Sequence, residues 1–168
     1  MSNKRRNSGM SELTMEIANE QDAVRIAEIA YQVAKIHDES APEYFKPVSQ
    51  AEQFKNIQEM LMDKNITVFK AVKKGKICGF LFLEMVHRQS RGLMFSKLGN
   101  ILNLGVDEKC RDKGIGTALL SYAEQYVRAC GGEALDLSVF AFNTEAIKLY
   151  ERLGYKIIDV SMRKILKD

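Results

Sequence analysis

The stretch that decides the fold of this chain runs from Ile101 to Gly116 and reads ILNLGVDEKCRDKGIG. Its apolar start with one internal glycine is typical of a strand, and a charged turn then leads into two closely spaced glycines. A periodic helix follows at once. Glycines let another group approach the backbone closely, and the free amides of a first helical turn point at an anion. The stretch therefore predicts a phosphate-binding turn.

The segments after this stretch alternate between helix and strand patterns. We expect, in order, a helix over residues 114–130, a strand over 134–140, a helix over 143–153 and two strands over 155–160 and 162–166. Gly131 and Gly154 follow the two helices, where a left-handed residue commonly ends a helix.

The segments before it begin with a leader over residues 1–12 that is expected to be disordered. The patterns then predict a strand over 13–18, a helix to about residue 37, a loop with both prolines over 38–47 and a helix from 49. Three strands follow, over 66–72, 76–86 and 99–106, and a loop over 87–98 joins the last two. Asn19 or Asp22 can cap the first helix, and Ser49 with Glu52 forms a capping-box pattern. Lys73-Lys74-Gly75 indicates a hairpin turn. We expect one mixed α/β (α+β) domain over residues 13–168.

Composition argues against several kinds of partner. The chain has 168 residues, enough for one domain, and a formal net charge of +3. Lys4, Arg5 and Arg6 lie in the leader, so the rest is near neutral, which disfavours a nucleic-acid partner. Apolar runs are too short to span a bilayer, and the leader lacks the apolar core of a secretory signal. We expect no membrane association.

The cysteines indicate a reducing compartment. Cys78, Cys110 and Cys130 are odd in number and have no CxxC spacing, which favours free thiols and a cytoplasmic location. With only His37 and His87 as further soft ligands, we expect no metal.

The glycine turn does not fit the common nucleotide motifs. The third glycine of a dinucleotide fingerprint is replaced by Leu119, and no GxxxxGK occurs. What remains is the form Q/R-x-x-G-x-G/A over Arg111–Gly116. On this hexapeptide alone, a helix start with surface charges is an equal alternative.

The flanking residues favour the first interpretation. The segment LNLGVDEKCRDKGIGTALLSYAEQYV, followed by NTEAIKLYERLGY, resembles the acetyl-CoA-binding signature of the GNAT family of N-acetyltransferases over residues 101–158. The resemblance implies a central, mostly antiparallel sheet of six to seven strands, a bulged and splayed central strand, and four flanking helices. It also implies acetyl transfer from acetyl-CoA by direct attack of a primary amine of a small molecule or peptide on the thioester. A homodimer is compatible with it.

The resemblance assigns the donor site. The backbones of Leu104 and Val106 would pair with the pantetheine arm, and Asn143 would hydrogen-bond to it. The pyrophosphate would be held by the turn residues Arg111, Asp112, Lys113, Gly114, Ile115, Gly116 and Thr117, the last adding its hydroxyl. Gly105, a glycine inside a strand, independently predicts the bulge.

Tyr150 would be the general acid that protonates the departing thiolate. Asn143 and Tyr150 are seven positions apart, two turns on one helix face and about 10 Å along the axis. The alternatives are a plain helix cap for Asn143 and core packing for Tyr150. The amide of Val106 would stabilise the oxygen of the tetrahedral intermediate.

The general base is where the sequence departs from the family. Many members carry a carboxylate on the central strand, where this chain has Leu102 and Asn103. Glu84, His37 and Glu43 are the candidates.

The sequence departs from the family pattern at two further positions of the turn, and two aromatic residues have two possible roles on the acceptor side. Cys110 stands where an aromatic residue is common, and Asp112 where glycine is usual. Tyr44 and Phe45 either shape the acceptor pocket or close the end of the core. The missing carboxylate also motivates a second hypothesis, a non-catalytic acyl-CoA-binding sensor.

Overall fold

The structure is a computed structural model that describes residues 13–87 and 94–166. Its contacts divide the chain into two compact units, with the boundary between Ser138 and Val139. The first unit contains β1 (Leu13–Ile17), η1 (Glu20–Asp22), α1 (Ala23–Ser40), α2 (Gln50–Met62), β2 (Ile66–Lys73), β3 (Lys76–His87), β4 (Lys97–Val106), η2 (Glu108–Cys110), α3 (Ile115–Ala129) and β5 (Ala134–Leu137). The second contains α4 (Thr144–Arg152).

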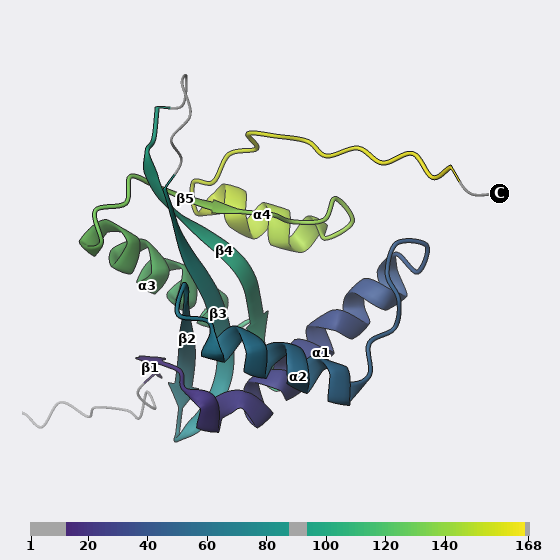
Figure 1. Ribbon diagram of the computed structural model, residues 1–168, viewed down its shortest axis with the longest axis horizontal. Helices are drawn as coiled ribbons and strands as arrows, with labels where there is room; N and C mark the ends of the chain where they lie inside the picture. Colours follow the sequence, from purple (N-terminus) through teal and green to yellow (C-terminus); the bar gives the residue numbers. More distant parts are fainter. Residues whose placement is uncertain (1–12, 88–93, 167–168) are drawn as a thin grey trace, which may run out of the picture. The chain divides into compact units, whose positions relative to one another are not determined.

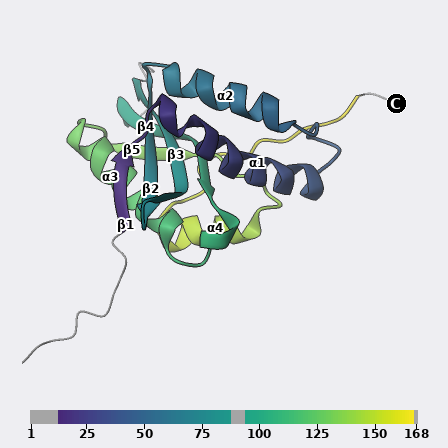
Figure 2. The ribbon, with the colours of Figure 1, turned by 90° about the horizontal axis from the view of Figure 1, so that it is seen from below.

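The strands of the first unit form one sheet in the order β1-β2-β3-β4-β5. Neighbours from β1 to β4 are antiparallel, and β4 and β5 are parallel. Helices α1 and α2 lie side by side over one face, and α3 covers the other (Figures 1 and 2). The sheet is therefore the middle layer of the first unit.

Alternation along β3 distributes its side chains between the two faces. Phe80 and Phe82 belong to a cluster with Ile26, Ile29 and Ile57 of α1 and α2. The intervening Leu81 and Leu83 are just as buried and face α3. Both faces of this strand are covered, which explains its nearly continuous apolar run.

Local signals of the sequence are confirmed at the caps and the hairpin. Ser49 and Glu52 form a reciprocal capping box before α2. Asn19 makes the equivalent box before η1, which leads directly into α1, whereas Asp22, the residue before α1, makes no side-chain cap bond to that helix. Lys74 and Gly75 have φ of 52° and 70°, the pair of left-handed residues that a tight hairpin needs.

Several element boundaries differ from the prediction by one or two residues, such as the start of β4 at Lys97, and two differ by three. Helix α1 runs to Ser40, beyond the expected end near His37, and the amide of Ala41 donates to the carbonyl of His37. Strand β5 ends at Leu137, short of the expected residue 140.

The expectation of six to seven strands is wrong, because the sheet has five strands among the residues that the structure describes. The two strands predicted over residues 155–160 and 162–166 have no regular secondary structure. Apolar side chains in this segment, such as Ile158 and Met162, are 79% and 93% exposed. Strand-forming residues become a strand only when another strand satisfies their backbone groups, and no such pairing is present among the described residues.

The bulge of the central strand is confirmed, but its predicted position is wrong. Leu83 pairs with Ile101 and Phe82 with Asn103, which leaves Leu102 as the extra residue. Gly105 lies beyond the bulge and has another reason to be glycine. A Cβ there would lie 2.5 Å from Cε1 of Phe80.

The predicted leader lies outside the described residues, as do residues 88–93, half of the loop expected between β3 and β4. No helix in the described part of the chain is long and apolar enough to cross a membrane. The same residues contain no cluster of three or more His, Cys, Asp or Glu side chains suited to a metal ion.

Candidate functional site

The last part of β4 has an unpaired backbone edge. Strand β5 pairs with β4 only from Leu98 to Ile101, whereas β4 continues to Val106. On its other side β4 stays paired with β3, and the amide of Asp107 donates to the carbonyl of Cys78 at 2.9 Å. Because antiparallel strands bond through alternate residues, the backbone groups of Leu104 and Val106 point away from β3. No described strand meets them there.

The edge leads into a turn whose backbone amides lack acceptors. We call the backbone N–H groups of residues 112–117 the amide cradle. None of these amides has an acceptor among the described residues. Two of the residues are left-handed, Asp112 with φ of 59° and Gly114 with φ of 74°. Gly114 also precedes the first turn of α3, whose amides have no intrahelical acceptor. Such convergent amides favour an anion.

Space above the cradle is open at Gly116. A Cβ built there would meet only Cγ2 of Val106, at 3.8 Å. At Gly114 it would meet nothing within 4 Å. Neither glycine is required by packing within the protein, unlike Gly105.

The charged side chains of the turn are mostly positive and fold back on its backbone. Nε of Arg111 donates to the carbonyl of Val106 at 3.4 Å, and Nζ of Lys113 donates to the carbonyl of Lys109 at 2.6 Å. Both side chains belong to exposed residues, as does Asp112, which adds one negative charge. The cations support anion binding, and Asp112 opposes it.

The turn is anchored to α1 through a buried carboxylate that the sequence reasoning missed. Among the residues that the structure describes, Asp107 is the one charged residue that is buried, with 3% of its surface exposed. Its carboxylate forms an ion pair with Arg25. Its other oxygen accepts from the amide of Lys109 at 2.8 Å. The amide of Glu108 donates to Oε1 of Gln32, at 3.0 Å, as a second tie to α1. Partners this far apart in sequence leave no local signal.

Despite its burial, the contacts of Asp107 with Arg25 and Lys109 lower the pKa of its carboxyl group. Burial acts to raise its pKa, but the hydrogen bonds from the Lys109 amide and from Arg25, with the positive charge of Arg25, lower the pKa below its usual value. The carboxylate is therefore ionised in the folded protein at neutral pH.

Asn143 and Tyr150 belong to the second unit. The side-chain oxygen of Asn143 accepts from the amide of Ala146 at 3.3 Å, so the residue is an N-cap of α4. Its amide nitrogen is a separate donor. The ring of Tyr150 meets that of Tyr155 edge-on at 5.8 Å, and burial raises the pKa of Tyr150.

The candidate bases lie on the α1–α2 side of the first unit. Glu84 is half-buried on β3, on the face of Phe82 and opposite Asn100 of β4. His37 lies in the last turn of α1 and contacts the ring of Phe45 at 5.3 Å. Burial lowers the pKa of His37, although Asp38 acts to raise it, so the neutral imidazole is favoured.

The remaining candidates lie in the proline loop after α1. Glu43 is exposed, and Tyr44 is 48% exposed. Tyr44 therefore does not close the core. Phe45 is half-buried against His37.

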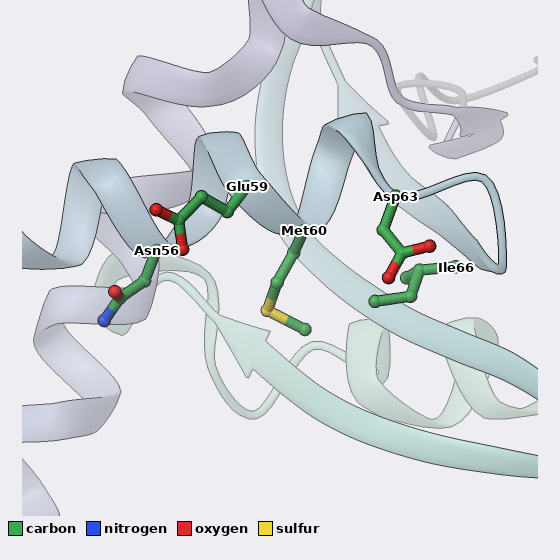
Figure 3. A pocket seen from close by; sticks show the side chains of 5 residues that line it. All are labelled: Asn56, Glu59, Met60, Asp63 and Ile66. Carbon is green, nitrogen blue, oxygen red and sulfur yellow. The ribbon is translucent and has the colours of Figure 1, made fainter.

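A separate hollow of about 430 Å³ lies where α2 turns into β2 (Figure 3). It is lined by Asn56, Glu59, Met60, Asp63 and Ile66, and includes none of the predicted site residues. The carboxylate of Asp63 accepts from the amide of Asn65 at 2.8 Å, so it serves the turn.

Comparison with known proteins gives a family match. The model of the Acetyltransferase (GNAT) family matches residues 33–155. The uncharacterized N-acetyltransferase YdgE of Bacillus subtilis is 31% identical over 102 residues, which cover 61% of this chain and 59% of YdgE. The chain spans less than two thirds of the curated relatives it matches first.

Solved structures have a similar fold. A tetramutant of the BH1408 protein from Bacillus halodurans superposes with a TM-score of 0.84 at 25% identity, covering 91% of this chain and 99% of that one. The aminoglycoside N-acetyltransferase AAC(6')-Iy, solved in complex with CoA, superposes with a TM-score of 0.75 at 15% identity, covering 96% and 99%. The latter likeness concerns the fold alone.

Proposed function

The chain belongs to the acetyltransferase (GNAT) family, and from this premise we propose that it is an N-acetyltransferase that transfers the acetyl group of acetyl-CoA to a primary amine. The acceptor is a small molecule or a peptide. The transfer is direct: the amine nitrogen attacks the thioester carbon, and the carbon–sulfur bond breaks to release CoA.

The observation that carries this proposal is the continuity of two backbone features. The unpaired edge of β4 at Leu104 and Val106 leads, through one short turn, into the amide cradle. An extended arm with amide groups can pair with the first as an added strand, and a pyrophosphate can bind the second. Pantetheine and the pyrophosphate of CoA are connected in this order. Arg111 and Lys113 add positive charge, and Thr117 can add its hydroxyl.

The proposed acid is Tyr150. A tyrosine is protonated at neutral pH, and burial raises the pKa of Tyr150 further, so it has a proton for the departing thiolate. Asn143 keeps its cap through the side-chain oxygen, which leaves the amide nitrogen to donate to the pantetheine arm. The amide of Val106 is the proposed donor to the oxygen of the tetrahedral intermediate.

The proposed base is Glu84 or His37. The strand carboxylate common in the family is replaced here by Leu102, which is 40% exposed at the bulge, and Asn103. Glu84 lies on the sheet face that Asn103 shares. His37 favours its neutral, proton-accepting form. Glu84→Gln and His37→Gln separate the two, because the variant that removes the base abolishes the ascending limb of the pH–rate profile.

Binding of CoA to glycine variants tests the donor site. Gly114→Val forces a β-branched residue into a left-handed conformation and is expected to abolish binding in calorimetric titration. Gly116→Ala is the matched control, since its methyl group finds open space and the family form allows alanine there. Both variants must first show native far-ultraviolet spectra. Undiminished binding by Gly114→Val would refute our position for the pyrophosphate.

A second candidate is an acyl-CoA sensor without catalysis, favoured by the absence of a carboxylate at Leu102 and Asn103. Both candidates bind CoA, so affinity does not separate them. Release of free thiol from acetyl-CoA in the presence of a panel of amines does. Turnover that falls in Tyr150→Phe, with acetyl-CoA affinity within a few-fold of the parent, supports the enzyme and its acid. No turnover with any amine supports the sensor.

A further inference from the structure

Two cysteines face a common hollow on the side of η2 that borders α1. The hollow measures about 640 Å³ and lies between α1, the β2–β3 turn and η2. Its lining includes Arg25, Gln32, Lys76, Cys78, Asp107 and Cys110. Cys78 belongs to β3 and Cys110 ends η2, so two elements separated by 32 positions in the sequence bring their thiols to one place.

Backbone bonds hold the two cysteines to the same residue. The carbonyl of Cys78 accepts from the amide of Asp107 at 2.9 Å, and the amide of Cys110 donates to the carbonyl of Asp107 at 2.8 Å. The carboxylate of Asp107 is itself fixed by Arg25. The bond from the amide of Cys110 belongs to the 3₁₀ turn η2 and keeps Cys110 close to the strand pair that contains Cys78. The fold therefore holds the backbones of Cys78 and Cys110 close together, and both residues line the same hollow.

We propose that Cys78 and Cys110 are a redox-modification site that forms a reversible intramolecular disulfide when the protein meets a hydroperoxide. The proposal does not depend on the acetyltransferase function. The disulfide would join β3 to Cys110, the residue before Arg111, and so to the segment that carries the amide cradle.

The chemistry balances with the hydroperoxide as the oxidant. The thiol of Cys110 attacks one peroxide oxygen, the O–O bond breaks, and Cys110 becomes a sulfenic acid while the peroxide leaves as water or an alcohol. The sulfur of Cys78 then attacks the sulfenic sulfur, the S–O bond breaks, and the leaving hydroxide takes the proton of the Cys78 thiol to become water. A dithiol reductant donates two electrons and two protons to restore both thiols.

The environments of the thiols set this order. Cys78 is 6% exposed, and burial, together with the neighbouring Cys110 thiol, raises its pKa to about 11. Thiolate is the reactive form, so Cys78 is a poor first target. Cys110 is half-exposed at the hollow. Cys130, at the end of α3, does not line this hollow and provides an internal control.

The full chain treated with hydrogen peroxide under native conditions tests the proposal. We expect two of the three thiols to be lost, with a peptide map that joins Cys78 to Cys110 and leaves Cys130 free. Dithiothreitol should return all three thiols. A cross-link that includes Cys130, a link between two chains, or oxidation of Cys110 to sulfinic acid with Cys78 still reduced would overturn it.

Variants test the order of the two steps. Cys130→Ser should form the same cross-link as the parent. In Cys78→Ala the sulfenic acid of Cys110 should persist and be trapped by dimedone, whereas in Cys110→Ser the buried Cys78 should stay reduced. Because Cys110 is half-exposed, Cys110→Ser remains a valid arm if the core substitution at Cys78 disturbs folding. Rapid oxidation of Cys78 in Cys110→Ser would refute the assigned order.

Discussion

The guanidinium of Arg25, in the first turn of α1, forms an ion pair with the buried carboxylate of Asp107, the residue that follows β4. The two residues are 82 positions apart. Through this pair the end of the central strand is fixed to the helix that covers its face. The hydrogen bond between the amide of Glu108 and Gln32 repeats the connection one residue later. The turn that carries the amide cradle thus starts from a rigid base.

Removing the charge of Asp107 should destabilise the protein. Breaking a buried ion pair leaves one partner uncompensated, and because Arg25 is 37% exposed we expect Asp107→Asn to cost about 1–3 kcal/mol in urea unfolding. The matched control is Glu28→Gln, which removes the exposed partner of the same guanidinium and should cost less than about 0.5 kcal/mol. Equal effects of the two variants would contradict the anchoring role.

The same carboxylate should make stability depend on acidic pH. The pKa of Asp107 is lower in the folded protein than in the unfolded chain, so its stabilising contribution is complete above the ordinary carboxyl pKa of about 4. It is lost as the pH falls through the lowered folded value. Urea unfolding at pH 7, 4 and 3 should show the loss in the parent and less of it in Asp107→Asn. Parallel curves for the two proteins would argue against it.

The contact between Gly105 and Phe80 should appear as an energetic coupling. Gly105→Ala places a methyl group within 2.5 Å of the ring of Phe80, which should cost roughly 1–3 kcal/mol of stability. In a Phe80→Leu background the same substitution should cost clearly less, because the smaller side chain leaves room. A double-mutant cycle from urea unfolding measures the difference. Strict additivity would show that Gly105 is constrained by something other than Phe80.

The left-handed conformation of Asp112 gives a prediction that separates stability from binding. Asp112→Gly removes a strained φ of 59° and should stabilise the fold by about 0.5 kcal/mol. If the cradle binds pyrophosphate, the loss of a negative charge there should also raise the affinity for CoA a few-fold. Lys74→Gly is the control, since it relieves a φ of 52° in the hairpin turn. It should leave CoA affinity unchanged in the same titration.

Sequence reasoning succeeded where the determinants are local. The capping box of Ser49 and Glu52, the hairpin at Lys74-Gly75 and the cap at Asn143 depend on side chains and backbone groups within three residues of one another. Each is a hydrogen bond or a φ value that the residue type itself favours. The central strand and the helix after its glycine turn were predicted to within two residues of their observed bounds.

It failed where the determinant lies on another element. Gly105 looked like a bulge from its own strand, yet its cause is the ring of Phe80 on the neighbouring strand. Residues 155–166 have strand-forming side chains but no strand beside them. The anchor of the candidate site, Arg25 with Asp107, joins the first helix to the central strand and has no signature in either segment alone.

The unpaired edge of β4 also bears on the tendency of the ligand-free protein to self-associate. An exposed row of strand amides and carbonyls is a template on which another chain can build, and such templates seed aggregates. Two features already described work against this. The extra residue at Leu102 bends the strand out of the flat geometry that stacking requires, and the side chain of Arg111 occupies the carbonyl of Val106 while placing a positive charge beside it. The edge therefore favours a narrow, negatively charged ligand over pairing with the same edge of a second chain.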